Sequence, residues 1–263
     1  MDKGNITKKV LMGAGIVLIA ACILSGRCAA EPSRCPYDIH LSIMYNYLTD
    51  DQRLLYDQIY DAIFAEEERV IVPDGMSRST AEWMIDYIYN EAPELCTYER
   101  WSTEVLDTND GKLEIRFAYK FPRSVQDQFM QEVDELAASF RGMSEKDGIQ
   151  NIHDYVINRF DYGTVEGEDT QLAYFALKNN KAICNGYAQT VAMLCHFAGY
   201  PCSYIDGNVY DNGGEGISRH AWNVASIDTQ FLWFDPTWDD TEQVRAWYGL
   251  DGVTMSQTHI PDP

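Results

Sequence analysis

The stretch that decides the fold is KAICNGYAQTVAMLCHFAGYP, residues 181–201. Small and apolar residues recur in it at helical spacing, which predicts a helix buried in the core. The stripe consists of Ala188, Val191, Ala192, Cys195 and Ala198. Gly199 and Pro201 mark the end of the helix, because glycine often closes a helix and proline cannot continue one. Cys184 therefore stands at the first turn of a core helix.

A cysteine in this position is favourably placed for chemistry. The N–H groups of a first turn lack helical partners and carry partial positive charge, which stabilises a thiolate and later the oxyanion of a tetrahedral intermediate. The pKa of a free thiol, about 8.5, falls further beside an imidazolium. Asn185 and Gly186 are expected to leave the approach to the sulfur uncluttered. The alternative is an inert buried thiol, the commoner state of an unpaired cysteine.

The chain after this helix predicts an antiparallel sheet. Residues 202–209, 220–227 and 231–235 are strand-like, and a glycine-containing loop, residues 211–218, separates the first two. His220 begins the second strand and Asp235 ends the third. A carboxylate beside that imidazole would fix its tautomer and stabilise its charged form. No comparable setting is expected for the other histidines, which are His40, His153, His196 and His259.

The turn between the second and third strands decides whether these two side chains meet, because side chains alternate faces along a strand. With a two-residue turn at Asp228-Thr229, Asp235 comes opposite Trp222, on the face of His220. A four-residue turn is also compatible. A regular three-residue turn without a bulge would put Asp235 on the wrong face.

Four blocks of the sequence resemble, in order, the signature blocks of the bacterial transglutaminase-like superfamily. They are AYFAL at 173–177, AICNGYA at 182–188, HAWN at 220–223 and DPTWDD at 235–240. The resemblance covers residues 144–240, and the order of the blocks makes it specific. It implies an α+β fold with a papain-like core, in which the nucleophile at a helix N-terminus packs on an antiparallel sheet. The sequence departs at residues 180–182, where many relatives have a glycine followed by a small or β-branched residue, and this should affect loop shape.

The resemblance also implies the roles of three residues. Cys184 would be the nucleophile, His220 the acid and base, and Asp235 the carboxylate that orients the imidazole. Gln171 is a candidate for the second oxyanion donor, beside the N–H of Cys184. No cofactor and no metal is expected.

Two groups of residues near these blocks allow two interpretations each. Trp222 and Trp238 either wall the substrate channel or pack the core, as tryptophans on strands beside a core helix commonly do. An acidic group could suggest Ca²⁺, but its spacing matches no calcium loop, so a solvated acidic surface is expected. This group consists of Asp228, Asp239, Asp240 and Glu242.

The part of the chain before these blocks predicts a small helix-plus-hairpin region, residues 37–122, ahead of a catalytic domain at 142–263. A capping box at Thr49 and Gln52 opens a helix that runs to about residue 66, and Ser79 or Thr80 caps a second helix. A short strand covers residues 70–73, and two extended stretches, 102–106 and 113–121, flank a turn. No low-complexity linker separates the two parts, so they are expected to pack together.

The first 30 residues predict an export signal. Three lysines precede an uncharged apolar run from Val10 to Leu24, which is shorter than the roughly 20 apolar residues that span a bilayer comfortably. Cleavage after Ala30 would release a secreted protein. IAAC, residues 19–22, resembles a lipoprotein box with Cys22 as the lipidated residue, and an uncleaved anchor is the third alternative.

Net charge and cysteine content limit the classes of partner and the cell compartments that are expected. The net charge is −21, and residues 1–30 hold four basic side chains and one acidic one, so the rest carries about −24 and nucleic acid is not an expected partner. Cys22 and Cys28 fall in the leader. The remaining five thiols are odd in number, which would leave one unpaired if the others form bridges. The candidate bridges are Cys35 with Cys96 and Cys195 with Cys202, although two small buried thiols explain the second pair equally well.

The expected reaction is acyl transfer from an amide of a protein or peptide, outside the cytoplasm or at the cell surface, with the membrane contacted only through the N-terminal segment. A protein amine as the second nucleophile would give crosslinking, and water would give a peptidase or amidase. The sequence leaves these two open. A non-catalytic binding module on the same fold is the alternative of a different class.

Overall fold

The computed structural model describes residues 35–210 and 216–262. The expected export segment, with Cys22 and Cys28, lies outside the described residues, as does most of the glycine-containing loop. In the part that is described, no helix is long and apolar enough to cross a membrane.

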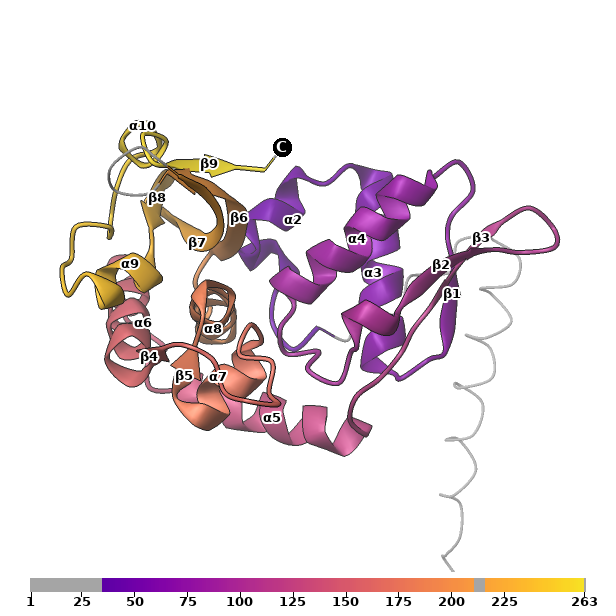
Figure 1. Cartoon of the computed structure of the whole chain (residues 1–263), viewed down its shortest axis with the longest axis horizontal. Helices are drawn as coiled ribbons and strands as arrows, with labels where there is room; N and C mark the ends of the chain where they lie inside the picture. The colour runs from indigo at the N-terminus through magenta and orange to yellow at the C-terminus, as the bar shows by residue number, and fades with distance from the viewer. Residues whose placement is uncertain (1–34, 211–215, 263) are drawn as a thin grey trace, which may run out of the picture. The chain divides into compact units, whose positions relative to one another are not determined.

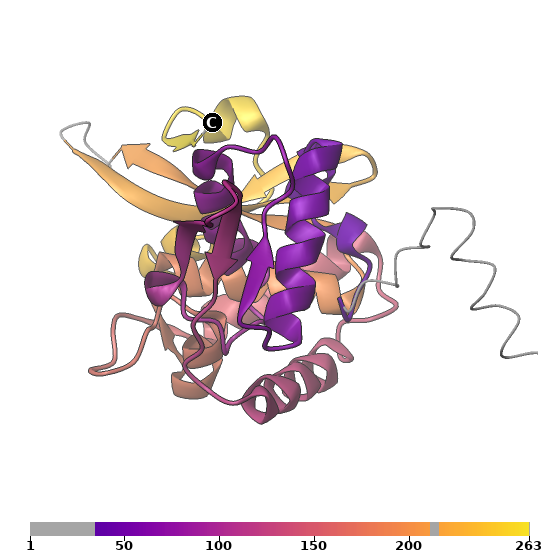
Figure 2. The ribbon, with the colours of Figure 1, turned by 90° about the vertical axis from the view of Figure 1, so that its right-hand side faces the viewer.

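The N-terminal region consists of helices packed beside a three-stranded sheet. Its strand order is β1-β3-β2, with both pairs antiparallel. The elements are η1 (Ile39–Leu41), α2 (Ile43–Tyr47), α3 (Asp50–Phe64), β1 (Arg69–Ile71), α4 (Arg78–Glu91), η2 (Arg100–Ser102), β2 (Glu104–Asp107) and β3 (Leu113–Arg116). Figure 2 turns this region toward the viewer, with its strands and the indigo helix α3 side by side.

Helix starts in this region follow from capping side chains. Thr49 accepts a hydrogen bond from the Gln52 N–H, and the Thr49 N–H donates to the Gln52 side chain, so the predicted capping box is confirmed. The predicted cap of α4 is wrong by two to three residues. Ser77 caps this helix by accepting from the Thr80 N–H, because the chain is already extended at Ser77.

The second region surrounds one central helix, as Figure 1 shows. Helix α8 packs against α5, α6 and α7 and against strands β6 and β7 of a four-stranded antiparallel sheet, ordered β8-β7-β6-β9. The elements are α5 (Arg123–Ala137), α6 (Glu145–Arg159), β4 (Asp161–Tyr162), α7 (Ala173–Asn179), β5 (Lys181–Ala182), α8 (Cys184–Ala198), β6 (Cys202–Tyr210), β7 (Ile217–Ile227), β8 (Gln230–Phe234), α9 (Pro236–Thr241), α10 (Gly252–Met255) and β9 (His259–Pro261). The structure is thus a mixed helix-and-sheet fold.

Helix α8 has the start, the end and the burial predicted for it. Every residue from Gly186 to Ala198 is buried, and Gly199 closes the helix at φ 92°. Of the turn lengths left open by the sequence, the two-residue turn is the one found. Ile227 pairs with Gln230 around the two-residue turn Asp228-Thr229, both of whose residues have positive φ.

The two regions share packing within one compact unit that begins at Arg34. Leu172 and Phe175, at the start of α7, belong to the apolar cluster of the N-terminal region, while the other face of α7 contacts α8. A polar joint is built by Glu91 on α4, which accepts hydrogen bonds from the Ser203 hydroxyl and the Tyr204 N–H of β6.

The cysteines do not form the candidate bridges. Cys96, Cys195 and Cys202 keep their thiols, so neither Cys35–Cys96 nor Cys195–Cys202 is a disulfide. All three are buried small groups in the core. Burial, together with the neighbouring Cys195 thiol, raises the pKa of Cys202 well above its usual range.

Gly186 allows a close approach at the start of α8. A Cβ there would lie 2.6 Å from the backbone oxygen of Thr170 and 2.9 Å from the Cβ of Ala182. Gly186 is itself buried. Its missing side chain lets the loop before α7 pack onto the helix that carries Cys184.

We predict that Gly186→Ala lowers the free energy of unfolding by about 1–3 kcal/mol, because a backbone oxygen cannot move aside as a flexible side chain can. Urea unfolding checks this value. Gly252→Ala is the matched control, since its added Cβ would meet no atom closer than 3.3 Å. Equal stability of the Gly186→Ala variant and the unaltered protein would contradict the prediction.

Glu94 is a fully buried carboxylate in the N-terminal region. Its Oε1 accepts hydrogen bonds from the Tyr37 and Tyr60 hydroxyls, and its Oε2 has no hydrogen-bond partner among the described residues. Burial raises the pKa of Glu94 to about 7, although the two tyrosines oppose the shift. The folded chain therefore binds a proton that an unfolded chain releases near pH 4.5. Stability must fall as the pH rises between these two values.

Glu94→Gln should remove this contribution, since the amide keeps the shape and does not titrate. We expect the difference in unfolding free energy between pH 5 and pH 8 to shrink by up to about 3 kcal/mol. Urea titrations at both pH values measure it. Glu104→Gln, at an exposed position of β2, is the control and should leave the difference unchanged.

Candidate active site

Cys184 is the first residue of α8 and is half-buried. Ile183 precedes it, and among the described residues no side chain caps the first-turn N–H groups. The thiol faces the Asn185 side chain, with 3.5 Å between Sγ and Oδ1. The Asn185 amide in turn donates to the Tyr204 hydroxyl of β6 at 2.9 Å, which fixes Asn185 beside the sulfur.

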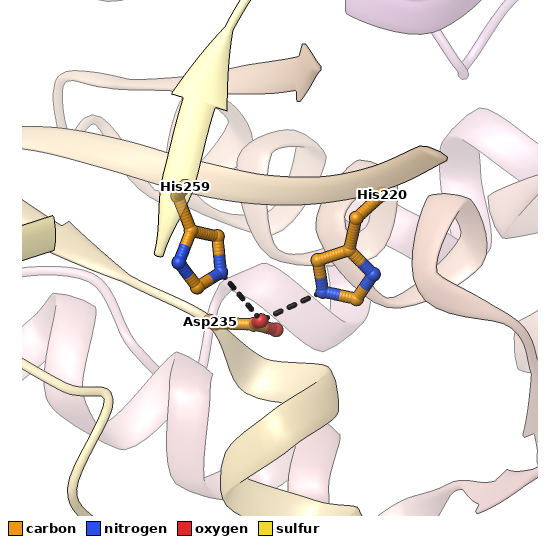
Figure 3. A group of neighbouring side chains, drawn as sticks. All are labelled: His220, Asp235 and His259. Atoms are coloured by element: carbon orange, nitrogen blue, oxygen red, sulfur yellow. Dashed lines mark hydrogen bonds and ion pairs between the residues drawn. The ribbon is translucent and has the colours of Figure 1, made fainter. Parts of the chain in front are cut away.

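His220 and Asp235 meet as their strand positions predict. His220 lies on β7 and Asp235 follows the last residue of β8, so the two-residue turn brings both to one face of the sheet. His220 Nε2 lies 2.7 Å from Asp235 Oδ2. In Figure 3 the other ring nitrogen, Nδ1, points away from this carboxylate.

The ring of His220 also interacts with Cys184. Burial alone would lower the pKa of His220, but the charge of Asp235, their hydrogen bond and the interaction with Cys184 outweigh it and raise that pKa to about 10. Since Nε2 is engaged by Asp235, Nδ1 is the nitrogen left for the thiol. Helix start, imidazole and carboxylate therefore form one connected set.

Asp235 is fully buried and has a second structural role. Its Oδ1 accepts the N–H groups of Thr237 and Trp238, so this carboxylate is the N-cap of α9. Burial opposes ionisation, but the charge and hydrogen bond of His220 and the hydrogen bond of His259 outweigh it and lower the pKa of Asp235 to about 2. The group is thus held as an anion inside the protein.

His259 is the residue that sequence reasoning missed. Its Nε2 lies 3.1 Å from Asp235 Oδ2, the same oxygen that His220 contacts, and its side chain is buried (Figure 3). The expectation that His259 has no comparable setting is therefore wrong. The signal was hidden because His259 arrives on β9, a three-residue strand too short to be recognised from alternation.

His220, Asp235 and His259 could also be considered as metal ligands, since their ligand atoms lie within 4.8 Å of one another. The two nitrogen–oxygen distances, 2.7 and 3.1 Å, are those of hydrogen bonds. Around a tetrahedral zinc ion with bonds of about 2.0–2.1 Å, ligand atoms stand farther apart, above about 3.2 Å. The arrangement fits two N–H groups that share a carboxylate oxygen.

Both tryptophans pack against this set. Trp222 is fully buried, and its ring stacks on His220 with centroids 6.3 Å apart, which supports the packing alternative for this residue. Trp238 is half-buried, with its centroid 5.5 Å from His220 and 4.6 Å from His259. Packed aromatic rings exclude water from the His220–Asp235 contact.

Gln171 lies on the loop that packs against the start of α8. The carbonyl of the preceding Thr170 accepts from the Ile183 N–H at 3.3 Å, while the Gln171 N–H donates to Asp169. Tyr162 on β4 is an exposed residue beside the set, and burial of its hydroxyl together with the charges of Cys184 and Asp235 raises its pKa. Sequence reasoning did not single out Tyr162, because nothing in its pattern distinguishes it from other tyrosines.

The acidic residues near α9 are only partly a solvated surface. Asp228 and Glu242 are exposed, but Asp239 is buried, accepts the Trp247 N–H and lies 3.2 Å from His153 Nε2. Half-buried Asp240 accepts the Tyr187 hydroxyl. The expectation of a wholly solvated surface is wrong because these two carboxylates bind α9 and its neighbours to the core.

Several solved structures resemble the chain loosely, and no curated protein matches it. A candidate cysteine protease from Cytophaga hutchinsonii is 15% identical, with TM-score 0.35, covering 65% of this chain and 67% of that one. The periplasmic domain of TgpA from Pseudomonas aeruginosa, bound to ethylmercury, is 16% identical, with TM-score 0.37, covering 57% and 69%. A TGase is 13% identical, with TM-score 0.34, covering 64% of this chain and 50% of its own. At these TM-scores the likenesses carry no functional argument.

The family assignment rests on the sequence itself. Residues 134–236 match the sequence model of the transglutaminase-like superfamily. The matched segment runs from the end of α5 to the first residue of α9 and contains Cys184, His220 and Asp235. This segment is therefore transglutaminase-like, and it covers less than half of the chain.

Proposed function

We propose that this protein is a thiol acyltransferase or hydrolase that acts on amide bonds of proteins or peptides, with Cys184 as nucleophile, His220 as acid and base, and Asp235 as the orienting carboxylate. The observation that carries the proposal is the contact of 2.7 Å between His220 and the buried Asp235, beside a thiol at the first turn of α8. Burying a carboxylate costs free energy unless the charge is paired. Here the carboxylate is paired with the imidazole nitrogen that faces away from the thiol, where it can orient the ring and stabilise its charged form.

The reaction follows from these positions. The Cys184 sulfur attacks the amide carbonyl carbon, the C=O π pair moves onto oxygen, and the first-turn N–H groups of α8 stabilise the oxyanion. His220, protonated at Nδ1, gives this proton to the leaving nitrogen as the C–N bond breaks, so ammonia or an amine leaves and a thioester remains. Neutral His220 then takes a proton from the second nucleophile, which attacks the thioester carbonyl. The C–S bond breaks and the sulfur leaves as the Cys184 thiolate, so the thiolate and the protonated imidazole are both restored.

The second nucleophile decides the product. A protein amine gives an isopeptide bond, and water gives hydrolysis. Gln171, Asn185 and Trp238 are the residues we would test for substrate contact. No residue of the set itself distinguishes the two outcomes, so both belong to the proposal.

We further propose that the protein works outside the cytoplasm, tethered at or released from the cell surface. The basic and apolar pattern of residues 1–24 supports this location. A protein or peptide partner fits the reaction, and the high negative charge argues against nucleic acid. The membrane would be contacted only through the N-terminal segment.

Thiol reactivity tests the nucleophile. We predict that iodoacetamide labels Cys184 at pH 7 at least about ten-fold faster than Cys35, because a thiolate paired with an imidazolium reacts where an ordinary thiol does not. Cys35 is an internal control of similar exposure, but burial raises its pKa to about 12, so the rate of Cys184 must also exceed that of free cysteine, an ordinary thiol, by about ten-fold. Peptide mapping by mass spectrometry gives both rates. Equal rates for the two residues would remove the basis for an enzyme and favour a binding module.

Product analysis tests the reaction. The protein and its Cys184→Ala variant are incubated with a glutamine-containing protein and a labelled primary amine. Amine incorporation or new peptide termini should appear with the unaltered protein and fall by at least about a thousand-fold in the variant, the scale of losing a covalent nucleophile. Incorporation identifies transfer, and new termini identify a peptidase. If the variant retains the activity, Cys184 is not the nucleophile.

A further inference from the structure

We propose that His259 is a positioning residue of this site, which holds the Asp235 carboxylate in the orientation that His220 needs. This inference rests on the proposed function and adds a fourth residue to it. The family match ends at residue 236, so His259 lies outside the matched segment.

The contacts of the carboxylate carry the argument. Asp235 Oδ1 accepts two N–H groups at the start of α9, and Oδ2 accepts His220 at 2.7 Å and His259 at 3.1 Å. Each oxygen therefore has two donors in a fully buried group. Rotation of the carboxylate would break contacts at both oxygens, so His259 resists the motion that would carry Oδ2 away from His220. Without His259, one oxygen of a buried anion would lose half of its donors.

The ring of His259 is itself fixed on its far side. Its Nδ1 lies 2.8 Å from the Thr258 hydroxyl oxygen, which also lies 3.4 Å from the Met255 carbonyl. The ring packs edge-on to Trp222, with centroids 4.8 Å apart, and against Trp238. The contact at Nδ1 and the packing against the two tryptophan rings fix the orientation of the imidazole. Its Nε2 is thereby directed at Asp235, as Figure 3 shows.

The fold makes room for the strand that brings His259. Strand β9 pairs antiparallel with β6, and Gly207 of β6 stands opposite Pro261. A Cβ on Gly207 would lie 2.2 Å from the carbonyl oxygen of Ile260 and 2.9 Å from the Cα of Pro261. Only glycine permits this approach. The same strand pair sets Val209 opposite His259.

The groups that face the His220–Asp235 pair come from several elements. Cys184 lies on α8, Tyr162 on β4 and His259 on β9. Among the contacts of the described residues, His259 donates to the carboxylate and none joins it to the thiol. Its effect on Cys184 must therefore pass through Asp235 and His220.

The test follows Cys184 alkylation by iodoacetamide from pH 5 to pH 10 in the full chain, for the unaltered protein, His259→Leu and His259→Gln. Leucine removes the donor, whereas glutamine keeps an N–H. We expect the leucine variant to react about ten-fold more slowly at pH 7, with its rise in rate moved to higher pH, since a hydrogen bond to a charged group has about this effect. The glutamine variant should recover most of the rate.

Two further variants separate positioning from stability. His196→Leu removes another buried imidazole, which contacts the Cys202 carbonyl near the far end of α8, and should leave the Cys184 profile unchanged while lowering the melting temperature. Thr258→Val frees the His259 ring without removing it and should slow alkylation by about three-fold. This milder variant decides the matter if circular dichroism shows that the leucine variant is unfolded.

The outcomes distinguish the two proposals. If Cys184 of the unaltered protein is alkylated rapidly and the leucine variant has the same pH profile, His259 has no positioning role. The proposed function is then unaffected. If the leucine and glutamine variants are slowed equally, the positioning role is also contradicted, because the hydrogen bond would then contribute nothing beyond the packing of the ring. A slow Cys184 in the unaltered protein defeats the proposed function, and the role of His259 fails with it.

Discussion

The structure depends on one buried anion. Asp235 directly follows β8, is the N-cap of α9 and accepts four hydrogen bonds, two from backbone N–H groups and two from imidazoles. A carboxylate without water must be saturated in this way, because an unpaired buried charge costs several kcal/mol. The sheet, the short helix α9 and the two histidines are therefore joined through this one carboxylate. Helix α8 brings the thiol to this point from the other side of the core.

The central helix and the register of the sheet could be predicted because both are local. The apolar stripe of α8 repeats every three to four residues, and the two-residue turn at Asp228-Thr229 fixes which face each side chain takes. From these two features the meeting of His220 and Asp235 follows without tertiary information. The start of α4 is harder to place, because several neighbouring hydroxyl residues could cap it and spacing alone cannot rank them. The extended backbone at Ser77 makes that residue the cap.

What could not be predicted depends on contacts between distant segments. His259 meets Asp235 because β9 pairs with β6, and Gly207 of β6 permits the close approach. A strand of three residues is too short to be predicted from alternation. Asp239 is buried because it lies against His153 of α6. A stretch of neighbouring acidic residues does not show which of them has such a partner. In each case the role of one residue is set by a partner far along the chain. The contact of Gly186 with the Thr170 backbone is hidden for the same reason.

The position of β9 has a consequence for biosynthesis. A chain emerges from its N-terminus, so the thiol, the imidazole and the carboxylate are all made before His259. Until β9 docks on β6, the carboxylate has an open side and the aromatic rings around it lack one wall. A nascent or truncated chain without β9 would thus hold the Asp235 carboxylate with three donors in place of four. Completion of this hydrogen-bond set would coincide with the docking of the strand, one of the last parts of the described chain to be made.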